Sequence, residues 1–339
     1  MERKRSRDPR PDERGRGAQQ PSDIPAPGWK DVAKRVRRSL SEHSIGLVAA
    51  GVAFYAMLSL FPALTAAVGM YGLFADESAV ENQLQALSGL IPGQASELLR
   101  QQLRDLVSQS GGALTLGAVG GLLLALWSAA KGVKALFIAL NIASGEDEKR
   151  SFILLNAQAL ATVVAGIAFT LVTLTLVLAI PVAIGILPVP DWLRTTLTLV
   201  RWPLLGIAGI TMLAFLYRFG PSRSDARWRW VSWGAVGAAL LWLAASAGFS
   251  WYVANLGSYN ETYGSLGAVI VLLMWLYVSA YAVVLGAVLN TEMERQTAQD
   301  STTGQPRPLG ERGARAADTV GPSAAELKRD KGRTARRAG

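Results

Sequence analysis

Few side chains in this 339-residue sequence could do the chemistry that enzymes and metal sites usually require. There is no Cys, and His43 is the only His. Thiolate nucleophiles, disulfides, iron–sulfur clusters and metal sites with two or more His ligands are therefore excluded. A nuclease that holds metal ions with a cluster of His and Asp residues is excluded with them. We expect no catalytic residue, no metal and no cofactor, and we interpret His43 as a structural residue at the entrance to a membrane span.

The first candidates for a site are cationic side chains close to long apolar runs, where a polar group is energetically costly. Lys131 and Lys134 follow an uncharged run and share one helix face near the cytoplasmic end of a predicted span. They either extend to the interface or line an anion-attracting cavity. Arg201 lies about 12 Å deep if its helix begins at Leu193. If residues 195–199 instead lie along the outer surface, Arg201 is an interfacial anchor.

The densest polar cluster near the predicted membrane joins the last two spans at the external side. It either forms a structural turn or lines a solute path, and its candidate residues are Asn255, Ser258, Tyr259, Asn260, Glu261 and Tyr263. Pro62, with Ser59 one turn earlier, is expected to kink the first span and to free backbone carbonyls nearby. These residues, with Lys131, Lys134 and Arg201, are the predicted substrate path.

The elements that must position these side chains are transmembrane helices. Half of the residues are hydrophobic and 17% are charged, whereas about a quarter is charged in ordinary soluble domains. Uncharged runs of about 20 residues or more are long enough to cross a bilayer. We predict an all-α polytopic protein with six spans, at residues 45–74, 111–143, 152–180, 193–217, 230–256 and 264–291.

Basic residues mark the loops expected on the cytoplasmic side. Lys and Arg are abundant before residue 45 and in the loop at 218–229, whereas acidic residues outnumber them at 76–110. By the positive-inside rule, both termini are cytoplasmic in a bacterial inner membrane. The external loop at 76–110 has two apolar stripes at helical spacing, separated by a Pro-Gly break. It predicts two short amphipathic helices that either cover the bundle or act as a lid.

Outside the membrane domain at 45–294, the chain is expected to be largely solvated. Residues 1–28 and 295–339 are predicted to be disordered basic tails, because they are rich in Arg, Pro and Gly. Residues 29–44 place Val32, Val36 and Leu40 on one face, which predicts an amphipathic helix on the cytoplasmic membrane surface. Membrane lipids are the expected partners, with no specific nucleic acid. Small residues on the spans allow close helix contact and a homo-oligomer.

Three segments resemble the YihY/BrkB family of bacterial inner-membrane proteins. They are AAGVAFYAMLSLFPAL from residue 49, LWSAAKGVKAL from residue 126 and NLGSYNETYGSLG from residue 255. The resemblance covers about residues 30–295 and implies a six-helix integral membrane protein, without implying a particular activity. The family has also carried the names ribonuclease BN and serum-resistance virulence factor. Because the nuclease ligands are missing, we do not expect ribonuclease activity.

The function predicted from the sequence is that of a transporter or permease-like protein for an unidentified small solute or lipid. The sequence has no GxxxxGK[ST] motif for nucleotide hydrolysis, and no acidic residue lies in the centre of a predicted span. Facilitated passage or coupling through a partner therefore fits better than a proton relay. The alternative function is a non-transporting membrane scaffold for envelope integrity or serum resistance.

Overall fold

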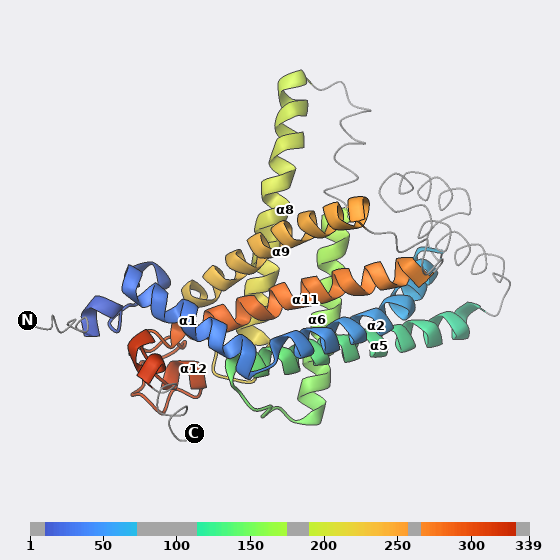
Figure 1. Cartoon of the computed structure of the whole chain (residues 1–339). Helices are drawn as coiled ribbons and strands as arrows, with labels where there is room; N and C mark the ends of the chain where they lie inside the picture. Colours follow the sequence, from blue (N-terminus) through green and yellow to red (C-terminus); the bar gives the residue numbers. More distant parts are fainter. Residues whose placement is uncertain (1–10, 73–113, 175–189, 257–265, 330–339) are drawn as a thin grey trace, which may run out of the picture.

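The computed structural model describes residues 11–72, 114–174, 190–256 and 266–329 (Figure 1). All regular elements in these ranges are helices, and a single isolated bridge pairs Ala226 with Thr302. The long helices are α1 (Ala26–Glu42), α2 (Ile45–Gly72), α5 (Leu114–Ser144), α6 (Phe152–Leu174), α8 (Asp191–Phe219), α9 (Trp228–Leu256) and α11 (Leu266–Glu294). Short helices are η1 (Pro11–Arg14), η2 (Pro21–Asp23) and α12 (Arg315–Asp318).

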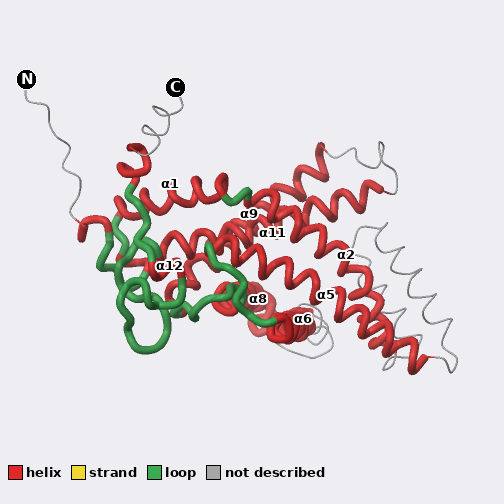
Figure 2. Tube along the Cα trace, turned by 90° about the horizontal axis from the view of Figure 1, so that it is seen from below, coloured by secondary structure: helices red, strands yellow, loops and turns green. Residues whose placement is uncertain are grey.

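Five of these helices, α5, α6, α8, α9 and α11, are long and apolar enough to cross a membrane. The bent pair formed by α1 and α2 supplies a sixth candidate span. Four helices (α2, α5, α9 and α11) run side by side, and α6 and α8 cross them steeply in both views (Figures 1 and 2). The chain is thus an all-α, multi-pass membrane protein, as the sequence predicts.

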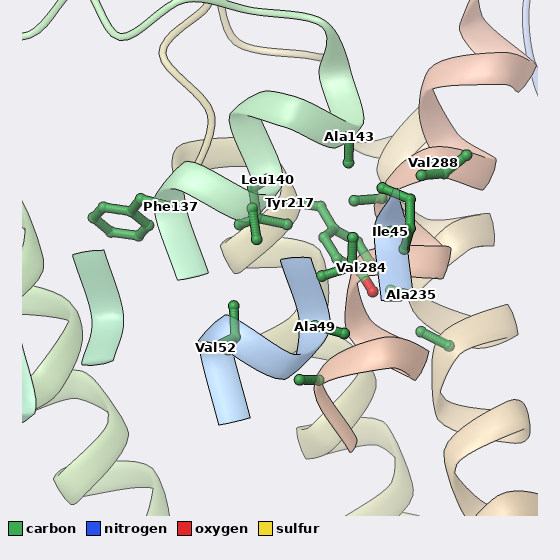
Figure 3. Packing of buried hydrophobic residues seen from close by; sticks show 14 of the residues in the cluster. Ile45, Ala49, Val52, Phe137, Leu140, Ala143, Tyr217, Ala235, Val284 and Val288 are labelled. Carbon is green, nitrogen blue, oxygen red and sulfur yellow. The ribbon is translucent and has the colours of Figure 1, made fainter. Parts of the chain in front are cut away.

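The hydrophobic core lies at one end of the helices. It takes Ile45 from the start of α2, Leu140 from the end of α5, Tyr217 from the end of α8 and Val288 near the end of α11 (Figure 3). Val231 near the start of α9 belongs to the same core. All five are buried, so the helices are packed most tightly where their chain ends and short connections meet. The first and last described segments, residues 11–25 and 295–329, also lie at this end (Figure 1).

Away from this core, the helices expose large apolar side chains. Trp192 and Leu199 on α8 are 69% and 64% exposed, and Trp251 on α9 is 62% exposed. In water such surfaces would be unfavourable at about 25 cal/mol per Å² of apolar area, but in a bilayer they contact acyl chains. The exposure of these residues therefore matches their place on candidate spans.

A sharp bend separates α1 from α2. The angle between the two helices is 63°, and the break consists of His43 and Ser44. Ser44 has a φ of 48°, a left-handed conformation that ends the α-helical path. The Ser39 hydroxyl lies 2.9 Å from His43 Nδ1, so the histidine helps to close the last turn of α1. His43 therefore stands at the junction with the first span, where the sequence interpretation placed it.

The apolar face of α1 packs on protein, where the sequence predicts that it contacts the membrane surface. Val32 is buried with Ala18, Trp230 and Met293, and Val36 packs beside them. The N-terminal segment, α9 and α11 each supply one of these partners, so together they close the apolar face. The exposed face of α1 is left with basic side chains.

The tails are ordered where the structure describes them, contrary to the prediction of disorder. Arg16 donates to the backbone carbonyls of Gln296 and Gly321, at 3.2 and 2.7 Å, and Thr297 Oγ1 donates to Ala18 O at 2.6 Å. We call residues 11–44 and 295–329 together the terminal cap. The cap shows how an Arg-rich segment becomes ordered without a large apolar core, because each guanidinium offers five donors to backbone carbonyls.

Arg312 shows the same principle within the C-terminal half of the cap. Its guanidinium donates to the carbonyl oxygens of Ala298, Gln299 and Ala317, at 2.8, 3.1 and 2.7 Å. The arginine is 5% exposed, so these acceptors replace its hydration. In the sequence these arginines indicated a solvated tail, whereas in the structure Arg312 is buried and binds the backbone of three other residues of the cap.

Two connections between spans reach the same cap. The backbone N of Arg315 donates to Glu146 Oε1 at 2.6 Å, and the backbone N of Arg227 donates to Ser301 O at 2.9 Å. The α5–α6 and α8–α9 connections therefore lie at the same end of the bundle, beside the terminal cap.

The helix ends differ from the predicted spans by a few residues. The fourth helix begins at Asp191 and ends at Phe219, where 193–217 was predicted. Helix α5 is described from Leu114, and residues 111–113 lie outside the described ranges. The third predicted span ended at 180, whereas α6 is described to Leu174 and the residues that follow lie outside the described ranges. The predicted external helices at 76–110 also lie outside the described residues.

Candidate functional site

The two lysines of α5 lie in the middle of their helix. Ser144 ends α5, so Lys131 and Lys134 precede its end by about 20 and 15 Å. The predicted span at 111–143 also extends past both lysines, and α5 ends one residue later. Beyond the lysines, Phe137, Leu140 and Ala143 form an apolar face that packs into the core. Lys131 and Lys134 therefore lie about three to four turns before the last residue of α5.

Lys131 is exposed and stacks on an aromatic ring of its own helix. Its Nζ lies 3.5 Å from the centroid of the Trp127 ring, one turn earlier, and Trp127 is 58% exposed. A cation over an aromatic face is stabilised by the ring quadrupole, the more so where water is scarce. Leu124, Trp127, Lys131 and Ile138 follow one another along the exposed face of α5. Lys131 therefore places one positive charge on an otherwise apolar stripe.

Lys134 links α5 to α6. Its Nζ donates to Asn156 Oδ1 at 2.8 Å, and the Asn156 amide nitrogen donates to Phe152 O at 2.7 Å. The asparagine thereby presents its oxygen to the lysine while its nitrogen is satisfied by its own helix. The pair is polar but carries a net positive charge, because an amide does not neutralise an ammonium group.

On another face of α5, Gly132 receives Ser59 from α2. A Cβ added at Gly132 would lie 2.8 Å from Ser59 Oγ, so the two helices approach closely there. The Ser59 hydroxyl donates to Tyr55 O at 2.7 Å and is buried. Ser59 thus bonds to the preceding turn, which satisfies its hydroxyl inside the bundle. The predicted kink at Pro62 is not tested, because the side chain of Pro62 lies outside the described residues.

Arg201 lies within a continuous helix. It follows Asp191 by ten residues, about 15 Å, and residues 195–199 belong to the same helix α8. Its guanidinium carbon lies 5.1 Å from the centroid of the Trp202 ring. Its Nε is buried without a hydrogen-bond partner in the described part of the chain. Of the two alternatives from the sequence, the structure favours the one in which the helix begins before Arg201.

The structure does not bring Arg201 together with the α5 lysines, and it leaves most of the third candidate region untested. Asn255 is exposed near the end of α9 and donates to Trp251 O at 2.8 Å, which is a bond within its own helix. The other predicted residues of this block lie outside the described ranges; they are Ser258, Tyr259, Asn260, Glu261 and Tyr263. Their role as a path lining stays a prediction.

Sequence reasoning missed the two buried ion pairs where α11 enters the terminal cap. Glu292 Oε2 accepts from Arg35 Nε at 2.7 Å, and Glu294 Oε2 accepts from Arg223 Nη2 at 2.6 Å. All four side chains are at most 4% exposed. In the sequence, the sign of these ion pairs is that Glu292 and Glu294 flank Met293 at the end of the last span. The sequence analysis treated these residues as the end of the span and did not consider partners for them.

A buried asparagine completes the contact between α9 and α11. Asn290 Oδ1 accepts from the backbone N of Gly234 at 2.8 Å, and its Nδ2 donates to Val231 O at 3.2 Å. Gly234 and Gly286 face each other across the same contact, so the backbones approach without side chains between them. This arrangement is typical of small-residue packing in membrane helices.

Hydrogen bonds in the α5–α6 connection stabilise an ionised carboxylate. Hydrogen bonds from Arg150 lower the pKa of Glu148 to about 2, and Asn141 contributes a further bond to this carboxylate. Among the described residues, no group of three His, Asp or Glu side chains could hold a metal ion. The site is therefore one of cations, amides and aromatic rings rather than of metal ligands or nucleophiles.

These features define the class: an all-helical, multi-pass membrane protein with lysines in mid-helix and a polar cap at one end. Residues 36–309 match the family model described as "Virulence factor BrkB", and the chain belongs to this family.

The chain is similar to curated bacterial proteins. It is 28% identical to the ribonuclease-like protein YfkH of Bacillus subtilis over 253 residues, which cover 73% of this chain and 89% of the relative. It is 26% identical to the UPF0761 membrane protein Mpe_A1422 of Methylibium petroleiphilum, covering 77% of this chain and 62% of that protein. A UPF0761 membrane protein of Alkalilimnicola ehrlichii is 28% identical over 76% of this chain and 56% of its own length. The chain thus spans less than two thirds of these two UPF0761 proteins, and no solved structure matches it.

Proposed function

We propose that this protein is a transporter or permease-like protein of the bacterial inner membrane, with both termini and the terminal cap in the cytoplasm. The cargo is a small solute or lipid with an anionic group, and it passes along the face of α5 that carries Lys131. The observation that carries the proposal is the position of Lys131: mid-helix, exposed and stacked on Trp127.

The charge of this face supports an anionic cargo. Within the described residues, Lys131 has no carboxylate partner, and Lys134 bonds to an amide. Three cations on candidate spans, with Arg201 as the third, therefore lack acidic partners in this part of the chain. A polar group within a span is retained at a free-energy cost, which favours a function in binding or passage. The cytoplasmic orientation rests on the basic residues of the cap and of both connections that join it.

Thiol accessibility tests the path, because the chain has no Cys of its own. Single-Cys variants at Leu124, Lys131 and Ile138 sample the exposed stripe of α5. Asp147→Cys, in the exposed α5–α6 connection, is the accessible control, and Ala139→Cys, at a fully buried position, is the inaccessible one. The reagents are membrane-impermeant thiosulfonates, one anionic and one cationic, applied to proteoliposomes of established orientation.

We expect all three stripe positions to react, and the anionic reagent to react faster than the cationic one at Leu124 and Ile138. Substituting Lys131 and Lys134 by Gln should reduce that preference, since it removes the local positive potential. Reaction confined to Asp147 would contradict the proposal and favour a packed, non-transporting scaffold. Labelling of Asp147→Cys from the outside of intact cells would contradict the proposed orientation.

A further inference from the structure

Three basic side chains form a straight stripe on the exposed face of α1. Lys30, Lys34 and Arg37 are spaced by four and three residues, which places them on one side of the helix. All three side chains are exposed, and none of them forms an ion pair or a hydrogen bond with the described residues. The acidic residues of α1 do not neutralise the stripe, because Asp31 is buried with Arg14 and Glu42 pairs with Arg38.

The opposite face of α1 is fully occupied by protein. Val32, Arg35 and Ser39 are buried there, and Arg35 bonds to Glu292 at the end of α11. Helix α1 therefore cannot enter a membrane with its apolar side. Its position is fixed by the cap, and what it offers to a partner is charge.

With Ile45, the first residue of α2, taken as the membrane boundary, the bend between α1 and α2 keeps this charge close to that boundary. Lys30 precedes the end of α1 by about 18 Å, and the 63° bend reduces its rise along the axis of α2 to about 8 Å. That height equals about one Debye length at physiological ionic strength. If α1 continued straight into α2 without the bend, Lys30 would lie more than two Debye lengths from the start of α2. The whole stripe thus lies within the range of the potential of an anionic lipid surface.

We propose that the stripe of Lys30, Lys34 and Arg37 binds the headgroups of anionic phospholipids in the membrane that the protein spans. The contact is electrostatic and holds the terminal cap against the bilayer surface. It is independent of the proposed transport function, because it involves neither α5 nor α6.

The experiment measures how close α1 lies to the headgroups in nanodiscs that contain the full chain. A fluorophore is attached to Ala33→Cys, an exposed position beside the stripe, and is quenched by a phosphatidylcholine that carries a nitroxide on its headgroup. Discs of phosphatidylcholine alone are compared with discs that contain 30% phosphatidylglycerol. We expect stronger quenching in the anionic discs and loss of the difference in 1 M NaCl, where the Debye length is about 3 Å.

The variant Lys30→Gln/Lys34→Gln/Arg37→Gln should abolish the difference between the two lipids. Each basic residue near an anionic surface changes the affinity for that surface about fivefold, so removing three should weaken the association of the stripe by about 100-fold. The matched control removes three exposed basic residues elsewhere, with Lys149→Gln, Arg194→Gln and Arg307→Gln, and should quench like the parent. Lys30→Arg/Lys34→Arg/Arg37→Lys should also behave like the parent, because it keeps the charge.

Equal quenching in both discs, or a lipid response that the triple variant leaves intact, would overturn the proposal. A fluorophore that responds to added RNA but not to phosphatidylglycerol would overturn it as well, in favour of a nucleic-acid surface. Folding of each variant is checked by its unfolding temperature, which should not change because the three side chains make no contact that stabilises the cap.

Discussion

Arg35 near the start of the chain and Glu292 near its end form a buried double contact. Arg35 Nε donates to Glu292 Oε2 at 2.7 Å, and Arg35 Nη2 donates to the backbone carbonyl of Glu292 at the same distance. The third nitrogen of the guanidinium donates to Pro322 O at 3.2 Å. One side chain therefore connects α1, α11 and the C-terminal segment, and it anchors the terminal cap to the membrane domain beside the bonds made by Ser301 and Arg315.

Removing one partner of this pair should destabilise the protein strongly. Arg35→Gln leaves the Glu292 carboxylate buried without its main counter-charge, and such losses amount to about 3–5 kcal/mol. We expect a lower unfolding temperature in detergent and faster proteolysis between residues 295 and 329. Arg38→Gln is the control: its pair with Glu42 is 36% and 52% exposed and should contribute no more than about 1 kcal/mol. Equal losses in both variants would contradict the assignment of Arg35 as an anchor.

The contact between α9 and α11 should not tolerate a methyl group at Gly234. A Cβ there would overlap the Asn290 amide and the Gly286 carbonyl, so Gly234→Ala should lower the free energy of unfolding by about 1–3 kcal/mol. Gly248→Ala, on the same helix but with open space around it, should leave stability unchanged or raise it slightly. Unfolding of both variants in detergent mixtures gives the comparison, and a neutral Gly234→Ala would show that the two helices pack less closely.

The approach of α2 to α5 beside the lysines can be tested by compensation. Gly132→Ala places a methyl group 2.8 Å from Ser59 Oγ and should destabilise the bundle. Ser59→Ala removes that oxygen, so the double variant should recover part of the loss, giving a coupling energy of about 0.5–3 kcal/mol. Additive effects in the double-mutant cycle would mean that the two residues are not in contact.

The α5–α6 connection should weaken in acid. The pKa of Glu148 falls from an ordinary value near 4.5 to about 2, mainly because Arg150 donates to its carboxylate. A carboxylate with a lowered pKa in the folded state contributes stability above pH 4.5 and loses it as the pH falls toward 2. Glu148→Gln should flatten this part of the stability profile, measured from unfolding temperatures between pH 6 and pH 3. An unchanged profile would contradict the pairing.

The spans were predictable because charge is absent from them, and absence of charge is a property of sequence alone. The start of α2 at Ile45 was predicted to the residue, and α8 and α9 each begin two residues before the predicted position. The partner of Lys134 was not predictable in this way. Asn156 lies on the next helix, α6, and only the packing of α5 against α6 brings its amide oxygen to the lysine.

The ordered cap escaped prediction for a different reason. Arg16 and Arg312 are ordered by backbone carbonyls, and every residue has a carbonyl, so no pattern of side chains reveals the acceptors. The sequence analysis did not identify Arg35 as a buried residue, because its partner Glu292 is 257 residues away in the sequence. Pairings over such a distance follow from the fold of the whole chain rather than from local periodicity.

The link between Arg35 and Glu292 also constrains the order of assembly. Among the long helices, α1 is synthesised first and α11 last, so this contact cannot form before α11 has been made. Until then Arg35 lacks its counter-charge, and the N-terminal segment lacks the carbonyls of Gln296 and Gly321. Closure of the cap is therefore a late step that follows the synthesis of α11, and a product truncated before α11 would leave Arg16 and Arg35 without these partners.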